Sequence, residues 1–342
     1  MKKYPPCFTI IFLFTVLLLL VRCGKPAPDQ SLFDTLYEEA PVKLTIETNL
    51  AAITQGKDTS SFQPAVISFK KNACKAINFE GEVKPRGVFR KKNCDFPPLK
   101  LKLGKSDLEA QNLKQYNTFK LVTPCREDYD FEQFVLKEYL AFRLYNVLTD
   151  RSFRVQLASI RHVDSQKKLP ETERYGFLIE DDDELASRLG GQIIGEETGP
   201  PKTIDKEQYK IFTLFQFMIG NTDWSLNNRH NALLIQPEHI NTPMPFPVPY
   251  DFDFCGMVGA PYAQPPGHLP IKSVKERIFQ WRGGQNEDLT PTFALFSSKR
   301  EELIRTCQDF ELLHNDSKAE VLAYLNSFFD MLESPDQIVG KN

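Results

Sequence analysis

The 342-residue sequence has few of the residues and patterns that mark a metal centre or a phosphate loop. Its seven cysteines and five histidines include no CxxC pair and no Cys/His cluster at zinc spacing, so no zinc site is expected. A GxGxxG segment is absent, and Gly81 and Gly87 come closest to a glycine-rich loop. The sequence also has no EF-hand calcium loop, no internal repeat and no low-complexity tract.

Charge of neither sign dominates the chain. The formal net charge is −3, and the one basic cluster, at 84–105, is local. Nucleic-acid-binding domains usually carry a basic excess, so no nucleic-acid partner is expected. Aromatic residues make up 12% of the chain and recur at helical spacing, which favours a role in the core over a stacking surface.

The longest apolar run, residues 8–21, follows Lys2 and Lys3 near the N-terminus. Its 14 residues are fewer than the roughly 20 that span a membrane, and the arrangement is typical of a secretory signal. It ends in Leu-Val-Arg-Cys-Gly, which is similar to a bacterial lipobox, although arginine is unusual before the cysteine. We therefore predict a lipoprotein-type signal peptide over 1–22, a lipid on Cys23 and a tether over 23–41. The protein would then be anchored in the bacterial cell envelope, or secreted if Cys23 is not lipidated.

Five cysteines remain after the signal region: Cys74, Cys94, Cys125, Cys255 and Cys307. Disulfides persist outside the cytoplasm, and residues between Cys74 and Cys94 look like a hairpin. We therefore expect a Cys74–Cys94 disulfide.

Hydrophobic periodicity predicts a β-rich first half and a mostly helical second half. Strands are predicted at 42–48, 64–70, 77–83, 99–103, 118–122, 153–162 and 174–180, and helices at 131–148, 206–219, 273–281, 290–308 and 318–332. This order predicts an α+β, bilobal protein-kinase-like fold. A β-rich N-lobe with one long helix would occupy residues 42–190, and a mostly helical C-lobe residues 191–342.

The segment from Met218 to Gly256 carries the residues that phosphoryl transfer requires, in the order found in protein kinases. Asp223 is predicted to accept or orient the attacking hydroxyl. Asn228 has the kinase loop spacing from Asp223, whereas Asn231 directly precedes the strand at 232–235, so both stay candidates for binding Mg²⁺. Asp251 corresponds to the metal-binding kinase aspartate. Asp253 would point to the same face of an extended segment and would also bind metal.

A lysine on the nucleotide phosphates and a helix glutamate that pairs with it complete the kinase set. Lys120, in the strand at 118–122, is predicted to pair with Glu138, 18 residues later in the long helix. Lys100 and Lys102 on the preceding strand compete for the phosphate role. The remaining candidates are Arg86, for phosphate contact, Glu180, near the adenine, and Glu132, as the alternative partner of the lysine.

The chain resembles the CotH family, the atypical kinases related to spore coat protein H, over roughly residues 80–260. The resemblance rests on six short motifs in order: Lys84-Pro-Arg-Gly, Phe96-Pro-Pro-Leu-Lys-Leu-Lys-Leu, Leu136-Lys-Glu-Tyr-Leu-Ala-Phe-Arg-Leu-Tyr, Tyr175-Gly-Phe-Leu-Ile-Glu, Gly220-Asn-Thr-Asp-Trp and Tyr250-Asp-Phe-Asp. It implies ATP binding and phosphorylation of protein Ser or Thr hydroxyls with Mg²⁺ or Mn²⁺.

Two classes of function follow from these features. The first is an exported kinase that acts on a surface or periplasmic protein and is held to the membrane by its N-terminal lipid. ATP is scarce outside the cytoplasm, so the alternative is a catalytically silent protein of the same fold that binds or assembles envelope structures. A third class, a metal-dependent hydrolase or calcium-stabilised adhesin that uses the same acids, is disfavoured, because the sequence has no EF-hand loop and no metal-binding His cluster.

Overall fold

The computed structural model describes residues 28–55, 61–71, 74–195, 203–238, 244–284 and 287–339. The predicted signal peptide and the predicted lipid site at Cys23 lie outside these ranges. Within the ranges, none of the helices combines the length and apolarity needed to cross a bilayer.

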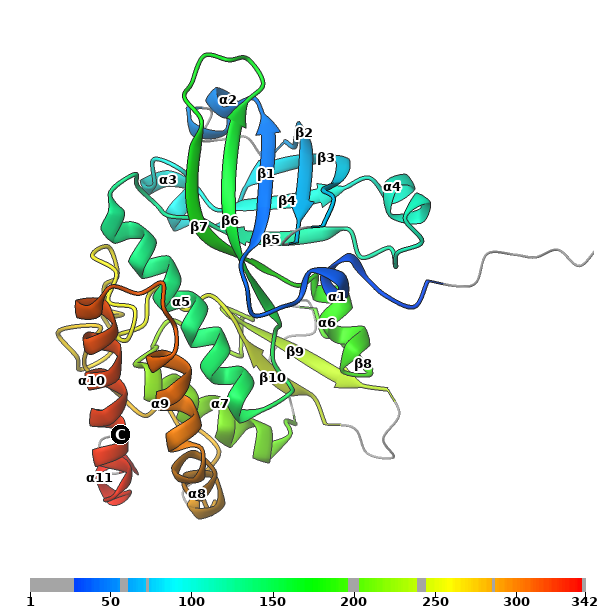
Figure 1. Cartoon of the computed structure of the whole chain (residues 1–342). Coiled ribbons are helices and arrows are strands. Elements are labelled where there is room, and N and C mark those ends of the chain that lie inside the picture. Colours follow the sequence, from blue (N-terminus) through cyan, green and yellow to red (C-terminus); the bar gives the residue numbers. More distant parts are fainter. Residues whose placement is uncertain are drawn as a thin grey trace, which may run out of the picture.

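Seven strands close into a barrel at one end of the molecule (Figure 1). Its neighbours run β1-β2-β3-β4-β5-β7-β6, and β6 returns to β1 through the barrel's one parallel pairing. The strands are β1 (Val42–Thr48), β2 (Gln63–Lys70), β3 (Ile77–Pro85), β4 (Leu99–Leu103), β5 (Thr118–Val122), β6 (Val155–Asp164) and β7 (Thr172–Ile179). The predicted bilobal protein-kinase-like fold is therefore wrong, because the strands expected as an N-lobe sheet form a closed mixed barrel.

Alternating apolar residues point into the barrel and form its core. In β1, for example, Leu44 and Ile46 are buried while Lys43 and Glu47 are exposed. Helix α1 (Leu32–Leu36) adds to this core, and its Phe33 ring lies 6.3 Å from that of Phe119. The described part of the predicted tether thus contains a helix that packs on the folded domain.

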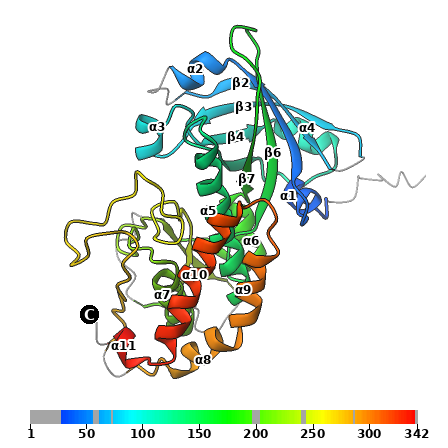
Figure 2. The same cartoon turned by 60° about the vertical axis from the view of Figure 1, so that its left-hand side comes forward.

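Helix α5 (Tyr129–Leu148) runs from the barrel into the helical half of the molecule (Figures 1 and 2). It shares a second core with α7 (Lys206–Ile219) and α10 (Asn315–Leu332). The Phe142 ring lies 5.6 Å from Phe177 of β7 and 4.6 Å from Phe252. Apolar packing along α5 therefore ties the barrel to the segment around Phe252.

The remaining elements are a small sheet and several helices. The sheet has the order β10-β9-β8, with β8 (Gly191–Ile193), β9 (Ala232–Pro237) and β10 (Phe246–Pro249). The other helices are α2 (Leu50–Thr54), α3 (Phe89–Asn93), α4 (Lys105–Ala110), α6 (Asp182–Arg188), α8 (Thr290–Ser298), α9 (Arg300–Gln308) and α11 (Asp336–Val339).

Two predictions for the helical half are corrected. Residues 273–281 form no helix, because the Arg277 guanidinium fixes this segment by donating to the Met218 and Tyr324 carbonyls and stacking on the Tyr324 ring. The single helix predicted at 290–308 is divided at Lys299 into α8 and α9.

The disulfide joins Cys94 to Cys125, not Cys74 to Cys94 as expected. Cys74 lies exposed between β2 and β3, whereas Cys94 lies beyond β3 as the C-cap of α3. The turn of α3 carries Cys94 to the segment after β5, where Cys125 lies. The error arose because a helical turn intervenes where a simple hairpin was expected.

Burial of His162 in β6 makes the stability of the protein pH-dependent. The side chain is 4% exposed, its ring lies 4.3 Å from that of Phe96, and its Nε2 has no hydrogen-bond partner. Burial lowers the pKa of His162 to about 4. As pH falls from 6.5 to 4, His162 is therefore protonated in the unfolded chain and stays neutral in the folded chain. Protonation stabilises the unfolded chain, so the protein loses stability over this pH range.

We predict that His162→Leu removes about 2–3 kcal/mol of the stability difference between pH 7.5 and pH 4.5. Urea unfolding of both proteins at the two pH values measures this difference. Comparison between the proteins cancels the carboxyl groups that titrate in the same range. An equal loss of stability in both proteins would contradict the assignment.

Candidate active site around Asp223 and Asp251

Asp223 lies in the turn that follows α7. Gly220 ends this helix in the left-handed conformation (φ 66°), and a Cβ there would lie 2.0 Å from the Tyr324 hydroxyl oxygen. Only glycine fits both conditions. Asn221 then fixes the turn, because its Nδ2 donates to Gln216 Oε1 at 3.0 Å and its Oδ1 accepts from the Asp223 amide at 3.0 Å.

A tight turn after Asp223 brings Asn231 and His230 back to its carboxylate. Ser225 and His230 exchange two backbone hydrogen bonds of 2.9 Å, and Asn231 adopts a positive φ of 52°. Asn231 Nδ2 donates to Asp223 Oδ2 at 3.0 Å, and His230 Nε2 lies 2.9 Å from Oδ1. Asn228 lies exposed in the turn, so Asn231 is the amide that the fold places at Asp223.

The hairpin of β9 and β10 returns the chain from Asn231 to Asp251. Pro249 pairs with Ala232, and the Tyr250 amide donates to the Asn231 carbonyl at 3.1 Å. Asp251 follows with a φ of 64°, a conformation that costs an L-residue about 1 kcal/mol or more and recurs at functional sites. Asn231 and Asp251 are thus neighbours through the hairpin register.

Asp253 is buried, with 5% of its surface exposed. Its Oδ2 accepts a 3.0 Å hydrogen bond from the Tyr262 hydroxyl and lies 4.0 Å from Arg90 Nη1. Burial and then the negative charge of Asp251 raise the pKa of Asp253 to about 7, although Arg90 and Tyr262 oppose the shift and Asp223 adds to it. The three aspartates therefore share one electrostatic site.

The predicted ion pair between Lys120 and Glu138 is wrong. Glu138 Oε2 instead lies 3.5 Å from Arg90 Nη1, and its Oε1 is buried without a hydrogen-bond partner. Burial raises the pKa of Glu138 well above its usual range, with the charge of Asp253 adding to the shift and Arg90 opposing it. The partner is the arginine of α3, which no periodic pattern in the sequence predicts.

Lys120 lies close to the same site with a different partner. Its Nζ is 2.5 Å from Asp182 Oδ1 and lies over the Tyr250 ring, 4.8 Å from the centroid. Burial lowers the pKa of Lys120 and Asp182 opposes this, while Arg86 lowers and Asp251 raises it through their charges. Arg86 and Asp251 are thus near enough for their charges to affect Lys120, whose ion-pair partner is Asp182 and not Glu138.

The lysine candidates on the barrel differ in their surroundings. Lys84, Lys100 and Lys120 are directly opposite one another on β3, β4 and β5, so their side chains share one face. Lys102 lies two residues along β4 from Lys100 and pairs with Glu82 at 3.2 Å on an exposed surface. Lys100 is therefore in register with Lys120, whereas Lys102 belongs to a solvent-exposed pair.

Glu180 and Glu132 serve the framework around the site. Glu180 is fully buried and accepts from the Arg154 amide at 2.7 Å, from Arg154 Nε at 2.9 Å and from Arg188 Nη2 at 2.6 Å. Its backbone amide is taken by the Arg154 carbonyl. Glu132 accepts from the Tyr175 amide at 2.8 Å. Both carboxylates thus bind groups of the protein framework.

The donor set at the centre of the site fits a hard cation. In the described ranges, no three His, Cys, Asp or Glu side chains are grouped to hold a metal, so a cation would depend on mixed donors. Asp251 and Asp253 supply carboxylates, and the Nδ2 bond of Asn231 to Asp223 leaves its Oδ1 as a neutral oxygen. Glu138 Oε1 is buried beside them without a hydrogen-bond partner. Mg²⁺ and Mn²⁺ prefer such oxygens.

Sequence reasoning missed three residues of this site: Arg90, Asp182 and Tyr262. Arg90 follows the Lys-Pro-Arg-Gly motif closely and Asp182 follows the strand β7, so both lay near segments already singled out. Tyr262 lies in a stretch with neither helix nor strand, where no periodic signal exists.

We predict that Glu180→Ala lowers the free energy of unfolding by about 3 kcal/mol, because it leaves Arg154 and Arg188 without their buried carboxylate. Affinity for metal and nucleotide should stay at the wild-type value. Urea unfolding and titration calorimetry measure the two effects, with Glu82→Ala as the exposed control, which should change stability by less than about 1 kcal/mol. Unchanged stability with weakened nucleotide binding would contradict the framework role.

None of the protein-family models matches this chain, and no curated protein has a sequence similar to it.

Proposed function

We propose that this protein is an exported phosphotransferase of the CotH type, which transfers the γ-phosphate of ATP to Ser or Thr hydroxyls of proteins with Mg²⁺ or Mn²⁺. The observation that carries the proposal is the cluster of Asp223, Asn231 and Asp251, assembled from one turn and one hairpin. The chemistry of this site needs these side chains in place and does not require a kinase-like fold.

Asp223 is suited to orient an attacking hydroxyl. Asn231 and His230 bind its two carboxylate oxygens and fix their direction. About a third of its side chain is exposed, so an acceptor can reach it. A fixed carboxylate in hydrogen-bond reach of a hydroxyl is the geometry that general-base or orienting catalysis requires.

The other groups of the site fit the remaining parts of MgATP. The magnesium ion and triphosphate supply the leaving group and the charge neutralisation of the reaction. Asp251, Asp253 and the Asn231 oxygen would hold the cation, while Lys120 would hold phosphate, with Lys100 and Arg86 near enough to assist. Lys120 would have to exchange Asp182 for phosphate, which is a substitution of one anion for another.

The location and partners follow from the N-terminal segment and from the resemblance. A lipid on Cys23 would place the domain on the cell envelope, and its acceptor would be a surface or periplasmic protein. The disulfide Cys94–Cys125 supports an oxidising compartment, because disulfides rarely persist in the cytoplasm.

A catalytically silent binding or assembly protein of the envelope is the alternative. The pairing of Lys120 with Asp182 in place of Glu138 favours it, because the lysine is not held towards the helix glutamate as in active kinases.

We predict Mn²⁺-dependent transfer of ³²P from γ-labelled ATP to the protein itself or to a generic acceptor protein. Asp223→Ala should lower the rate by about 10²–10⁴-fold, because the hydroxyl loses its orienting carboxylate. Asp251→Ala should remove both transfer and metal-dependent ATP binding in calorimetry.

Asp330→Asn is the matched control, because Asp330 is exposed on α10. Its transfer rate should equal that of the wild type. Absence of transfer together with absence of metal-dependent ATP binding in the wild type would reject the enzyme and favour the envelope binding protein.

A further inference from the structure

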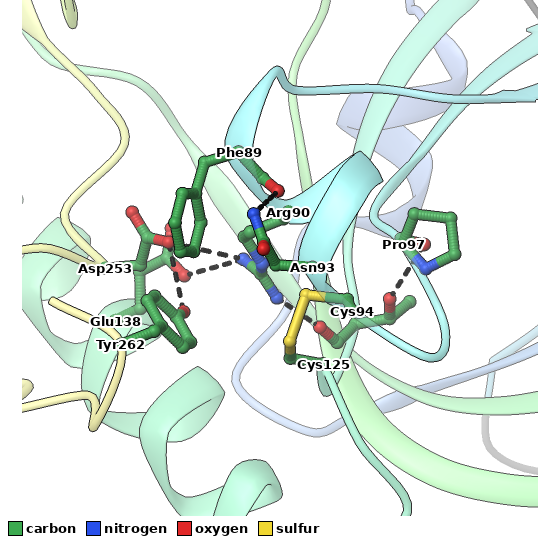
Figure 3. The surroundings of a disulfide bond; sticks show 10 residues. Phe89, Arg90, Asn93, Cys94, Pro97, Cys125, Glu138, Asp253 and Tyr262 are labelled. Atoms are coloured by element: carbon green, nitrogen blue, oxygen red, sulfur yellow. Dashed lines mark hydrogen bonds and ion pairs between the residues drawn. A yellow bond between two sulfur atoms is a disulfide. The ribbon is translucent and has the colours of Figure 1, made fainter. Parts of the chain in front are cut away.

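Helix α3 lies between the disulfide and the segment that carries Asp253 (Figure 3). It has five residues, Phe89–Asn93, and an isolated helix of this length is unstable in water. Its position must therefore come from contacts beyond the helix, and these contacts are of two kinds.

On one side, α3 is fixed to the end of β5. Cys94, its C-cap, is bonded to Cys125, and the Cys125 carbonyl accepts from the Asp95 amide at 2.9 Å and from the Phe96 amide at 3.3 Å. Arg90 Nη2 donates to the Thr123 carbonyl at 2.5 Å. One covalent bond and three hydrogen bonds thus join α3 and the residues directly after it to residues 123–125.

On the other side, α3 contacts the segment of residues 251–263 through two side chains. The Phe89 ring lies 5.3 Å from that of Phe254 and 5.4 Å from that of Tyr262. Arg90 lies 4.0 Å from Asp253, whose Oδ2 is held in turn by the Tyr262 hydroxyl. Figure 3 shows the rings of Phe89 and Tyr262 next to each other, with Asp253 beside them.

The segment 251–263 contains neither helix nor strand, so its side-chain contacts decide where its carboxylates lie. The amides of Gly256 and Met257 bond to Gly220 and Ile219, which fixes the middle of the segment on the end of α7. Asp253 lies before this anchor and Tyr262 after it. Arg90 contacts Asp253 and Phe89 contacts Tyr262, in addition to the packing of Phe252 on Phe142 of α5.

We propose that α3 is a disulfide-anchored clasp that positions Asp253, two residues after Asp251, for the cation of the proposed phosphotransfer. The clasp consists of Phe89, Arg90, Cys94 and Cys125. Phe89 and Arg90 are positioning residues, which act on the cation through Asp253. The inference rests on the proposed function for its role and on the described contacts for its existence.

The first test measures the clasp without any ligand. Hydrogen exchange of the full chain is compared among the wild type and two variants, Cys94→Ser/Cys125→Ser and Phe89→Ala. Neither variant changes the charge of the protein. The amides of residues 255–263 should exchange at least about tenfold faster in both variants, while those of β1 keep wild-type rates. Cys74→Ser, at the exposed free cysteine, and Arg143→Met, at the Glu39 ion pair on α5, are matched controls and should behave as wild type.

The second test measures the positioning effect by Mn²⁺ binding, followed by electron paramagnetic resonance. Loss of groups that orient metal ligands typically weakens metal binding 10–100-fold, and we expect about tenfold for both clasp variants. Dithiothreitol should weaken Mn²⁺ binding of the wild type and of Cys74→Ser to the same extent. It should leave Cys94→Ser/Cys125→Ser unchanged.

The outcomes separate the clasp from the proposed function. Unchanged exchange in residues 255–263, or faster exchange throughout the chain, overturns the clasp, because the disulfide would then serve general stability. If the wild type binds no Mn²⁺, the proposed function fails and the positioning role falls with it, whatever the exchange shows. If the double cysteine variant does not fold, Phe89→Ala, which keeps the disulfide, decides between these outcomes.

Discussion

The burial of Arg90 between Glu138 and Asp253 is the constraint around which the candidate site is arranged. Charges removed from water are costly unless they lie together, so a buried carboxylate requires a cation that the fold can deliver to it. Here α3 supplies the positive charge of Arg90, α5 supplies Glu138, and the segment after β10 supplies Asp253. Three elements distant in sequence therefore meet at one point, and the point lies beside Asp251.

The chemistry of arginine explains why this role does not fall to Lys120. The guanidinium of Arg90 reaches the Thr123 carbonyl with one nitrogen while another faces both carboxylates. An ammonium group has no such planar fork and acts as a single charge. Lys120 accordingly has one carboxylate partner, Asp182, and rests on the Tyr250 ring. That arrangement leaves it freer than Arg90 to change partners when an anion binds.

Local patterns in the sequence predicted most individual elements but not their assembly. The alternation of β1 and the apolar periodicity of α7 are properties of consecutive residues, and both elements have the predicted bounds. The parallel pairing of β1 with β6 closes the barrel across more than a hundred residues, and no local pattern encodes it. Asp223 and Asp251 were recognisable because turn and hairpin are local. The partner of Glu138 was not, because α3 reaches it only through the tertiary fold.

Tyr324 of α10 packs against two glycines on which the site depends, Gly220 and Gly256, which are hydrogen-bonded to each other. A Cβ on Gly220 would lie 2.0 Å from its hydroxyl oxygen and one on Gly256 would lie 2.4 Å from it, so the hydroxyl occupies the space that both side chains would need. The turn before Asp223 and the segment after Asp251 thus both pack on a residue near the C-terminal end of the chain. A fragment that ends before α10 would keep every acidic residue of the site and lose the side chain that packs on both of these glycines. Inactivity of such a fragment would therefore say nothing about which residues carry the chemistry.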